Sequence, residues 1–173
     1  MDVKKTVHSD LLDKETLFEG KIYLSQGVFR WQGETPEKSV LIFDGKVIWN
    51  VQYHSVDFPG PIQVARGEVN KKNKQQILLL TLLDPLRFKK SFEVKKLSLE
   101  GTKQVFELAP KSDSLSLKKI EVFVEKKIIE KITYVDEVDN KTTLVFSNTD
   151  FDLKKDPKLF KYKPEKGAQV SPL

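Results

Sequence analysis

Residues 27–31 read Gly-Val-Phe-Arg-Trp, and residues 41–49 read Leu-Ile-Phe-Asp-Gly-Lys-Val-Ile-Trp. In a strand, successive side chains alternate between the two faces, so Phe29 and Trp31 share one side and Arg30 lies on the other. The second stretch is apolar at odd and even positions alike, which predicts a sheet with two apolar faces. Such a sheet needs a cover on each face, and one of the covers can be a ligand.

The dipeptide Asp44-Gly45 predicts a tight hairpin turn, because glycine tolerates a positive φ. The return strand then places Trp49 and Val51 on one face and Ile48 on the other. These strands belong to a chain of 173 residues, and no linker-like stretch divides it. We therefore expect a single domain over residues 1–173.

Short apolar runs separated by turn signals continue along most of the chain, which favours an antiparallel meander of about ten or eleven strands. Residues 1–16 are polar and are interpreted as the lead-in to the first strand. A sheet of this size must close, stack or curl. The expected strands are 17–24, 28–32, 39–43, 46–53, 91–99, 103–108, 117–124, 128–137, 142–147 and 160–163.

The middle of the chain departs from this pattern. Residues 54–74 are expected to form a long connection, since Pro59-Gly60-Pro61 forbids regular structure. Residues 75–83 are rich in leucine and predict a short helix, and residues 86–88 predict a second one. A further helical turn is expected over residues 156–160.

Composition limits the classes of function. Charged residues make up 32% of the chain and hydrophobic residues 39%, with a net charge of +5. The charge comes mainly from lysine rather than the arginine that reads bases and phosphates, so we expect no nucleic-acid partner. Cysteine is absent, which excludes a disulfide framework and a thiolate site. The N-terminus lacks the apolar segment of a signal peptide, so the protein is cytosolic or its signal has been removed.

No residue pattern for catalysis, metal binding or a cofactor stands out, so we expect no enzyme and no cofactor. His8 and His54 lack partners at ligand spacing. The acidic stretch 136–140 is interpreted as a solvated turn rather than a cation site, because it lacks the glycine and final glutamate of a calcium loop. Two readings of the apolar residues stay open: a filled sandwich core and a ligand cavity.

Phe29-Arg30-Trp31, Pro36 and the hairpin Asp44-Gly45-Lys46 with Trp49 resemble the signature of the periplasmic outer-membrane lipoprotein carriers, the LolA family. In that family a strand ending in F-x-W precedes a proline and a D-G-K-x-x-W hairpin. The resemblance spans about residues 17–170. Its further elements are the lid helix at Leu78-Leu79-Leu80, the F-x-L-x-P strand end at residues 106–110, and the closing motif at Phe160, Pro164, Gly167 and Val170.

The resemblance implies an unclosed, strongly curved antiparallel β-barrel that wraps short lid helices around a hydrophobic cavity. It also implies a soluble periplasmic carrier that binds the acyl chains of lipoproteins. Its partners would be acylated lipoproteins, an inner-membrane lipoprotein-releasing ABC transporter and an outer-membrane acceptor. The acyl-binding residues it suggests are Ile22, Leu24, Phe29, Trp31, Ile42, Trp49, Leu79, Leu80 and Leu83.

The chain departs from the family pattern at two places. Ser25 and Gln26 stand where the family has an Arg-Pro pair whose arginine holds the lid closed, so lid control is assigned to Ser25 and Arg30. The family's N-terminal helix has no counterpart in residues 1–16. Two alternatives follow: the sequence is a truncated form, or the hollow is more open than in the family. A second copy of the chain could close an open hollow, which makes self-association an alternative.

Other functions stay open beside the carrier. The same fold could bind a different lipid or a glycolipid, or could act as a lipoprotein receptor, a type that normally has a lipidated cysteine and an exposed apolar loop. A filled core would instead favour a pure interaction protein.

Overall fold

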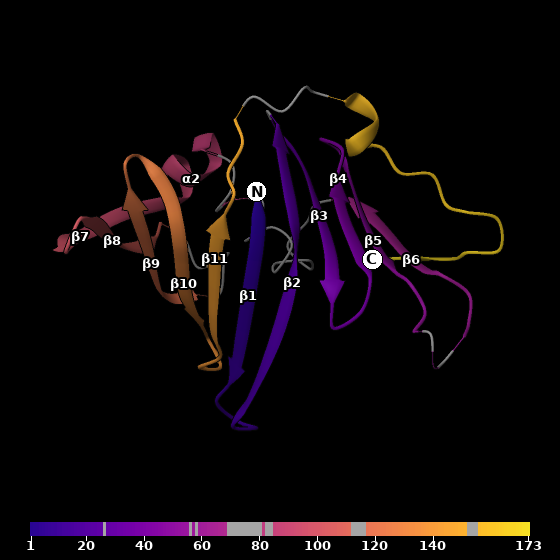
Figure 1. The fold of residues 1–173 in the computed structure, drawn as a ribbon, viewed down its shortest axis with the longest axis horizontal. Helices are drawn as coiled ribbons and strands as arrows, with labels where there is room; N and C mark the ends of the chain where they lie inside the picture. Colours follow the sequence, from indigo (N-terminus) through magenta and orange to yellow (C-terminus); the bar gives the residue numbers. More distant parts are fainter. Residues whose placement is uncertain are drawn as a thin grey trace.

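The computed structural model describes residues 1–25, 27–55, 57, 59–68, 81, 85–111, 117–151 and 156–173. Within these residues, twelve strands form one sheet in the order β12-β6-β5-β4-β3-β2-β1-β11-β10-β9-β8-β7 (Figure 1). The strands are β1 (Asp2–Ser9), β2 (Lys14–Ser25), β3 (Val28–Thr35), β4 (Ser39–Phe43), β5 (Val47–Gln52), β6 (Gln63–Glu68), β7 (Phe92–Glu100), β8 (Lys103–Pro110), β9 (Leu117–Glu125), β10 (Ile128–Asp136), β11 (Lys141–Ser147) and β12 (Gln169–Pro172).

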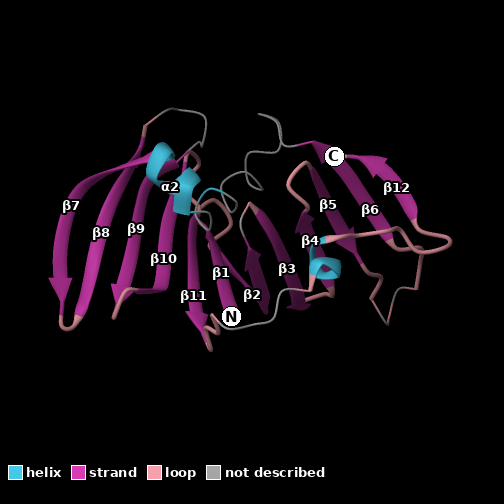
Figure 2. Ribbon diagram, turned by 90° about the horizontal axis from the view of Figure 1, so that it is seen from above, coloured by secondary structure: helices cyan, strands magenta, loops and turns pink. Residues whose placement is uncertain are grey.

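The sheet is open and strongly curved, as expected, with β12 at one edge and β7 at the other. Seen from above, the strands follow an arc (Figure 2). Neighbouring strands run antiparallel, except that β12 pairs with β6 in parallel. In the described part of the chain, the helical elements with defined bounds are α2 (Pro85–Ser91) and the 3-10 helix η3 (Pro157–Phe160). No helix among the described residues has the length and hydropathy needed to cross a membrane.

Strand β1 lies in the middle of the sheet, where it pairs with β2 on one side and β11 on the other. Asp2 lies opposite Ser147, and His8 lies opposite Lys141. The seam between β1 and β11 therefore joins the N-terminal and C-terminal parts of the chain into one sheet.

The hairpin between β4 and β5 has the geometry that its sequence predicts. Oδ1 of Asp44 accepts hydrogen bonds from the backbone N–H groups of Lys46 (2.9 Å) and Val47 (2.8 Å). Gly45 has a φ of 101°, which a residue with a side chain rarely adopts. The turn fixes the register of β4 and β5, so that Ile42 lies opposite Trp49.

The concave face of the sheet carries the larger apolar cluster, and α2 lies inside the arc on this side (Figure 2). Alternation along the strands gives every strand from β1 to β5 and from β8 to β11 an apolar row on this face. Phe88 of α2 contacts Phe92 with the ring centroids 5.3 Å apart. The buried members are Val3, Ile22, Phe29, Trp31, Phe43, Ile48, Phe92, Leu108, Ile120, Val122, Ile132, Leu144 and Phe146.

The convex face carries a smaller cluster over β4, β5 and β6, whose buried members are Val40, Ile42, Val51 and Val64. The C-terminal segment covers it, because Tyr162 and Ala168 pack against these residues. The Tyr162 ring lies 5.5 Å from the Trp49 ring between centroids. Both faces of this part of the sheet are thus covered, and residues of the chain itself help to cover the convex one.

Three sequence-based expectations differ from the structure. Residues 1–16 are more than a lead-in, because they contain β1. The expected connection 54–74 contains β6, which follows directly after the proline-rich turn. The expected strand 160–163 is wrong, since Tyr162 packs on the convex face and the last strand is β12 at 169–172. The expected helix 75–83 lies outside the described residues apart from Thr81, whereas the second helix is confirmed by α2.

Candidate functional site

The candidate site begins with the N-terminal wall of the concave face, formed by β2, β3 and β4. Ile22 lies opposite Trp31, and Leu24 lies opposite Phe29, so these four side chains share one face. Phe29 in turn lies opposite Phe43 of β4. Ile22, Phe29, Trp31 and Phe43 are buried, whereas Leu24 is 38% exposed near the end of β2. The structure therefore brings together four of the side chains predicted to bind acyl chains.

Two other predicted residues lie on the convex face. Ile42 lies opposite both Arg30 and Trp49 in neighbouring strands, so these three side chains point away from the concave face. Ile42 is fully buried there. The register of β4 against β3 decides this placement, and the sequence does not reveal that register.

The residues predicted to control a lid are not next to one another. Ser25 pairs with Val28 at the end of the β2–β3 hairpin, where Gly27 has a φ of 70°. Arg30 lies on the convex face, where one of its Nη atoms donates a hydrogen bond to the carbonyl oxygen of Leu159 at 3.3 Å. Gln26, Leu79, Leu80 and Leu83 lie outside the described residues.

The C-terminal wall of the concave face contains residues that the sequence analysis did not select. Val122 lies opposite Ile132 and Phe106, and Ile120 lies opposite Leu108. Phe106 is half-buried and the others are buried. The available signal is the apolar residue at every second position from Ile120 to Val124 in β9, but this row contains no aromatic motif that draws attention.

Polar groups interrupt this apolar face at a few places. Lys5 of β1 lies opposite Phe18 and Leu144, and its Nζ lies 5.0 Å from the centroid of the Phe18 ring. Burial lowers the pKa of Lys5 below its ordinary value. Tyr134 lies opposite Thr142 on the same face, and burial raises the pKa of its hydroxyl.

A cavity of about 540 Å³ lies over β8 to β11. It is a poor site for an acyl chain, because four charged side chains line it. Lys103 and Glu130 form an ion pair at 2.6 Å, which raises the pKa of Lys103. Lys131 lies 3.4 Å from the centroid of the Phe123 ring. Its lining residues are Glu100, Lys103, Phe123, Glu130, Lys131, Val145 and Phe146.

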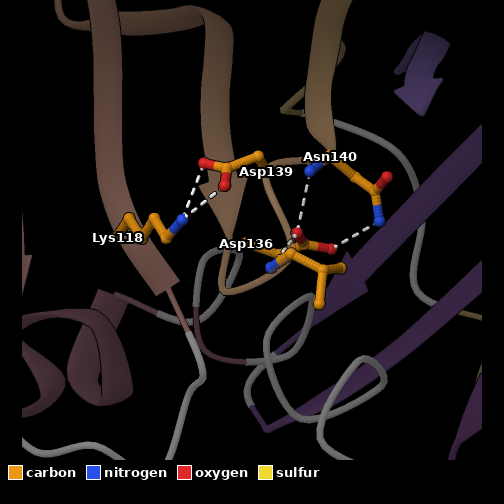
Figure 3. A network of polar contacts seen from close by, with 5 residues as sticks. Lys118, Asp136, Asp139 and Asn140 are labelled. Atoms are coloured by element: carbon orange, nitrogen blue, oxygen red, sulfur yellow. Dashed lines mark hydrogen bonds and ion pairs between the residues drawn. The ribbon is translucent and has the colours of Figure 1, made fainter. Parts of the chain in front are cut away.

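In the acidic hairpin between β10 and β11, two carboxylates are engaged by neighbouring groups of the chain (Figure 3). Asp136 accepts hydrogen bonds from the backbone N–H groups of Val138 (3.0 Å) and Asn140 (2.9 Å), and from Nδ2 of Asn140 (3.0 Å). Asp139 forms an ion pair with Lys118 at 2.6 Å. Among the described residues, no group of three or more histidines and acids is arranged to hold a metal ion.

Comparison with known proteins places this fold among lipoprotein carriers. The family model described as "Outer membrane lipoprotein carrier protein LolA" matches residues 4–163. An outer-membrane lipoprotein carrier protein of Coxiella burnetii is 26% identical over 145 residues, which cover 83% of this chain and 65% of that protein. One of Xanthomonas campestris pv. campestris is 27% identical over 148 residues, covering 82% and 66%.

The chain thus spans about 65% of the length of the curated relatives that it matches. A solved structure of an uncharacterized conserved protein from Thermus thermophilus is similar, with a TM-score of 0.46 and 14% identity. That match covers 100% of this chain and 91% of the other. Because the family match extends over most of the sequence, the chain belongs to the outer membrane lipoprotein carrier protein LolA family.

Proposed function

We propose that this protein is a carrier that binds the acyl chains of lipoproteins on its concave face. The observation that supports the proposal most directly is the apolar cluster that extends across this face from β5 to β7. Each methylene removed from water is worth about 0.8 kcal/mol, so a long acyl chain gains on the order of 10 kcal/mol by leaving water. A carrier achieves this when the cargo replaces the groups that cover its apolar face. The exchange requires no covalent bond to form or break.

The relatives' names supply the rest of the proposal. They are outer-membrane lipoprotein carriers, so we infer a periplasmic location and transport toward the outer membrane. Acylated lipoproteins would be received from an inner-membrane ABC transporter and passed to an outer-membrane acceptor. Ion pairs at the surface, such as Lys4–Glu19 and Lys119–Glu121, keep the exterior polar while the concave face stays apolar.

We propose that Ile22, Leu24, Phe29 and Trp31 contact the acyl chains, together with Phe43. All five lie on the concave face of adjacent strands. Leu24 is the most exposed of them and lies near the end of β2, which suits a first point of contact with a cargo that enters from the rim.

The two tryptophans of the chain provide a direct test, because Trp31 lies on the concave face and Trp49 on the convex face. The variants Trp49→Phe and Trp31→Phe each leave a single tryptophan. An acyl chain that carries bromine atoms quenches the fluorescence of a tryptophan in contact with it. We expect the brominated chain to quench the variant with Trp31 and to leave the variant with Trp49 unchanged.

A release assay with lipoprotein-loaded inner-membrane vesicles complements this measurement. The full chain should remove acylated lipoprotein from the vesicles, and Phe29→Glu should abolish the removal because it places a carboxylate among the apolar side chains. Circular dichroism must first show that the variant is folded.

In the fluorescence measurement, quenching of Trp49 alone, or equal quenching of both tryptophans, would contradict binding on the concave face.

One observation favours a second candidate, a receptor that delivers cargo into a membrane. Leu11 and Leu12 at the tip of the β1–β2 hairpin are 89% and 71% exposed. Two adjacent leucines on a protruding turn can insert into a lipid surface. Flotation with lipid vesicles separates the candidates: a receptor binds vesicles through this tip and loses them in a Leu11→Glu, Leu12→Glu double variant, whereas a carrier does not float in either form.

A further inference from the structure

The concave face contains a lysine at its centre. Lys5 is the fourth residue of β1, which is itself a central strand of the sheet. It lies two residues from the buried Val3 and opposite the buried Leu144, so its side chain belongs to the concave face. The preceding residue, Lys4, has the opposite orientation and forms an ion pair with Glu19 at 3.7 Å on the exposed side.

The described residues around Lys5 do not balance its charge. Its ammonium group lies over the Phe18 ring, and its other strand neighbour is Leu144. Among the described residues, no carboxylate forms an ion pair with it, and burial lowers its pKa with no compensating acid. An uncompensated cation on an apolar face costs free energy, so its presence needs an account.

Two hydroxyl groups accompany Lys5 on this face. Thr142 lies two residues before Leu144 in β11, and Tyr134 lies opposite Thr142 in β10. Thr142 is buried, and a hydrogen bond between the two side chains offsets part of the effect of burial on the Tyr134 pKa. By register Thr142 is a diagonal neighbour of Lys5, because it lies opposite Val7. An ammonium group on an otherwise apolar face is the group that binds a carboxylate or phosphate oxygen through a charge-assisted hydrogen bond.

We propose that Lys5 binds the anionic headgroup of an acyl-chain amphiphile whose hydrocarbon part lies along the N-terminal wall of the concave face. The inference rests on the proposed carrier function and adds a preference to it. Apolar contacts with Ile22, Phe29 and Trp31 hold any acyl chain, whereas Lys5 selects chains that end in a carboxylate or a phosphate. The anion also provides the oppositely charged partner that the described part of the chain does not offer to Lys5.

The test compares pairs of ligands that share one acyl chain and differ in charge. Oleate is paired with oleyl alcohol, and 1-oleoyl-lysophosphatidic acid is paired with 1-monooleoylglycerol. Affinities for the full chain are measured below the critical micelle concentration, by displacement of a neutral fluorescent probe. A charge-assisted contact at a half-buried site predicts about tenfold or stronger preference for an anionic member over its neutral counterpart.

The variants assign this preference to one residue. Lys5→Met should abolish the preference for the anionic member of each pair, and Lys5→Arg should retain it. Lys4→Met is the matched control, because it removes the same charge from the adjacent residue on the exposed face. It should leave the preference intact, also at high salt, where attraction to the basic surface is screened.

The outcomes are distinguishable. If the preference depends on Lys5 in one pair of ligands alone, the headgroup is identified as a carboxylate or as a phosphate. If the wild type binds neutral and anionic ligands equally, or if Lys5→Met keeps the preference, the inference is overturned and the carrier function stands. If the wild type binds none of the four ligands, the proposed carrier function fails and the inference falls with it.

Discussion

Arg30 donates a hydrogen bond at 3.3 Å to the carbonyl oxygen of Leu159, which lies 129 residues further along the chain. The bond joins β3 to η3 on the convex face. Among the described residues, Nε of Arg30 is buried without a hydrogen-bond partner. The Arg30 side chain therefore has one nitrogen in a hydrogen bond and one buried nitrogen without a described partner.

We expect Arg30→Met to loosen the C-terminal segment and to destabilise the protein by about 1 kcal/mol, because a hydrogen bond from a charged donor is lost while the stem keeps its packing. Hydrogen exchange should rise in residues 157–161. Arg66→Met is the control, since Arg66 lies over Trp49 at 5.3 Å on the same face and its side chain donates no hydrogen bond to Leu159. Equal exchange in both variants would contradict the role of Arg30.

For Tyr162 we expect a substitution to keep or raise the stability of the protein rather than to lower it. Its hydroxyl is buried without a partner among the described residues, and burial raises its pKa. Tyr162→Phe removes the unsatisfied group and keeps the ring contact with Trp49. We expect the free energy of unfolding in urea to stay equal or to rise by up to about 1 kcal/mol. Tyr162→Ala should lower it, and a loss in the phenylalanine variant would show that the hydroxyl has a partner.

Gly20 is required where β2 approaches β3. A Cβ at this position would lie 2.9 Å from the carbonyl carbon of Gln32 and 2.9 Å from Cα of Gly33, and both are backbone atoms. Gly20→Ala must therefore move a strand, and we expect it to destabilise the protein by about 2 kcal/mol or more. Gly60→Ala is the control, since a Cβ there meets open space. Thermal unfolding of the two variants should differ clearly, and equal melting temperatures would refute the close approach.

Lys5 makes stability depend on pH with a definite sign. Burial lowers its pKa in the folded state, so the unfolded chain binds more protons between the lowered and the ordinary value. The penalty of the buried charge is fully present below the lowered pKa and disappears as the pH rises through this interval. Lys5→Met should thus stabilise the free protein by on the order of 1 kcal/mol at neutral pH.

The gain from Lys5→Met should shrink as the pH rises toward the ordinary lysine value. Urea unfolding of the wild type and the variant at several alkaline pH values measures the difference. Lys4→Met, on the exposed side of the same strand, should change stability by less than about 0.5 kcal/mol at neutral pH. A gain that is constant with pH would mean that the charge of Lys5 is not the cause.

The two aspartates of the β10–β11 hairpin should contribute unequally. Asp136 accepts three hydrogen bonds within the turn, so Asp136→Ala should cost about 1–2 kcal/mol. Asp139 forms an exposed ion pair with Lys118 and has a φ of 65°. Asp139→Asn tolerates that backbone conformation and should cost less than about 1 kcal/mol. Chemical denaturation ranks them, and a larger loss for Asp139→Asn would reverse the assignment.

The sequence was informative wherever a local rule determined the structure. Alternation placed Phe29 with Trp31 and opposed both to Arg30, and Asp44-Gly45 predicted its turn. Prediction from the sequence fails where pairing with a strand that is distant in the chain determines the structure of a segment. Strand β6 follows a proline-rich turn and is held between β5 and β12, and β12 itself is a four-residue strand with exposed side chains.

The candidate site shows the same limit. The alternation of side chains shows which residues of one strand share a face. It does not show which residues of the neighbouring strand lie on that same face of the sheet. Ile42 and Trp49 were therefore assigned to the hollow with Phe29, although the β3–β4 register places them on the convex side. Lys5 was overlooked because it lies in a polar stretch, and only its pairing with Phe18 and Leu144 reveals its position.

The central position of β1 has a consequence for the order in which the molecule folds. Asp2 lies opposite Ser147, so β1 gains this second neighbour only after β11 has been synthesised. Until then β1 is an edge strand with unpaired backbone groups and one apolar side, the kind of edge that recruits other chains. Closing so long a loop is slow. The nascent protein is most vulnerable to aggregation at this seam until β11 covers the exposed edge of β1.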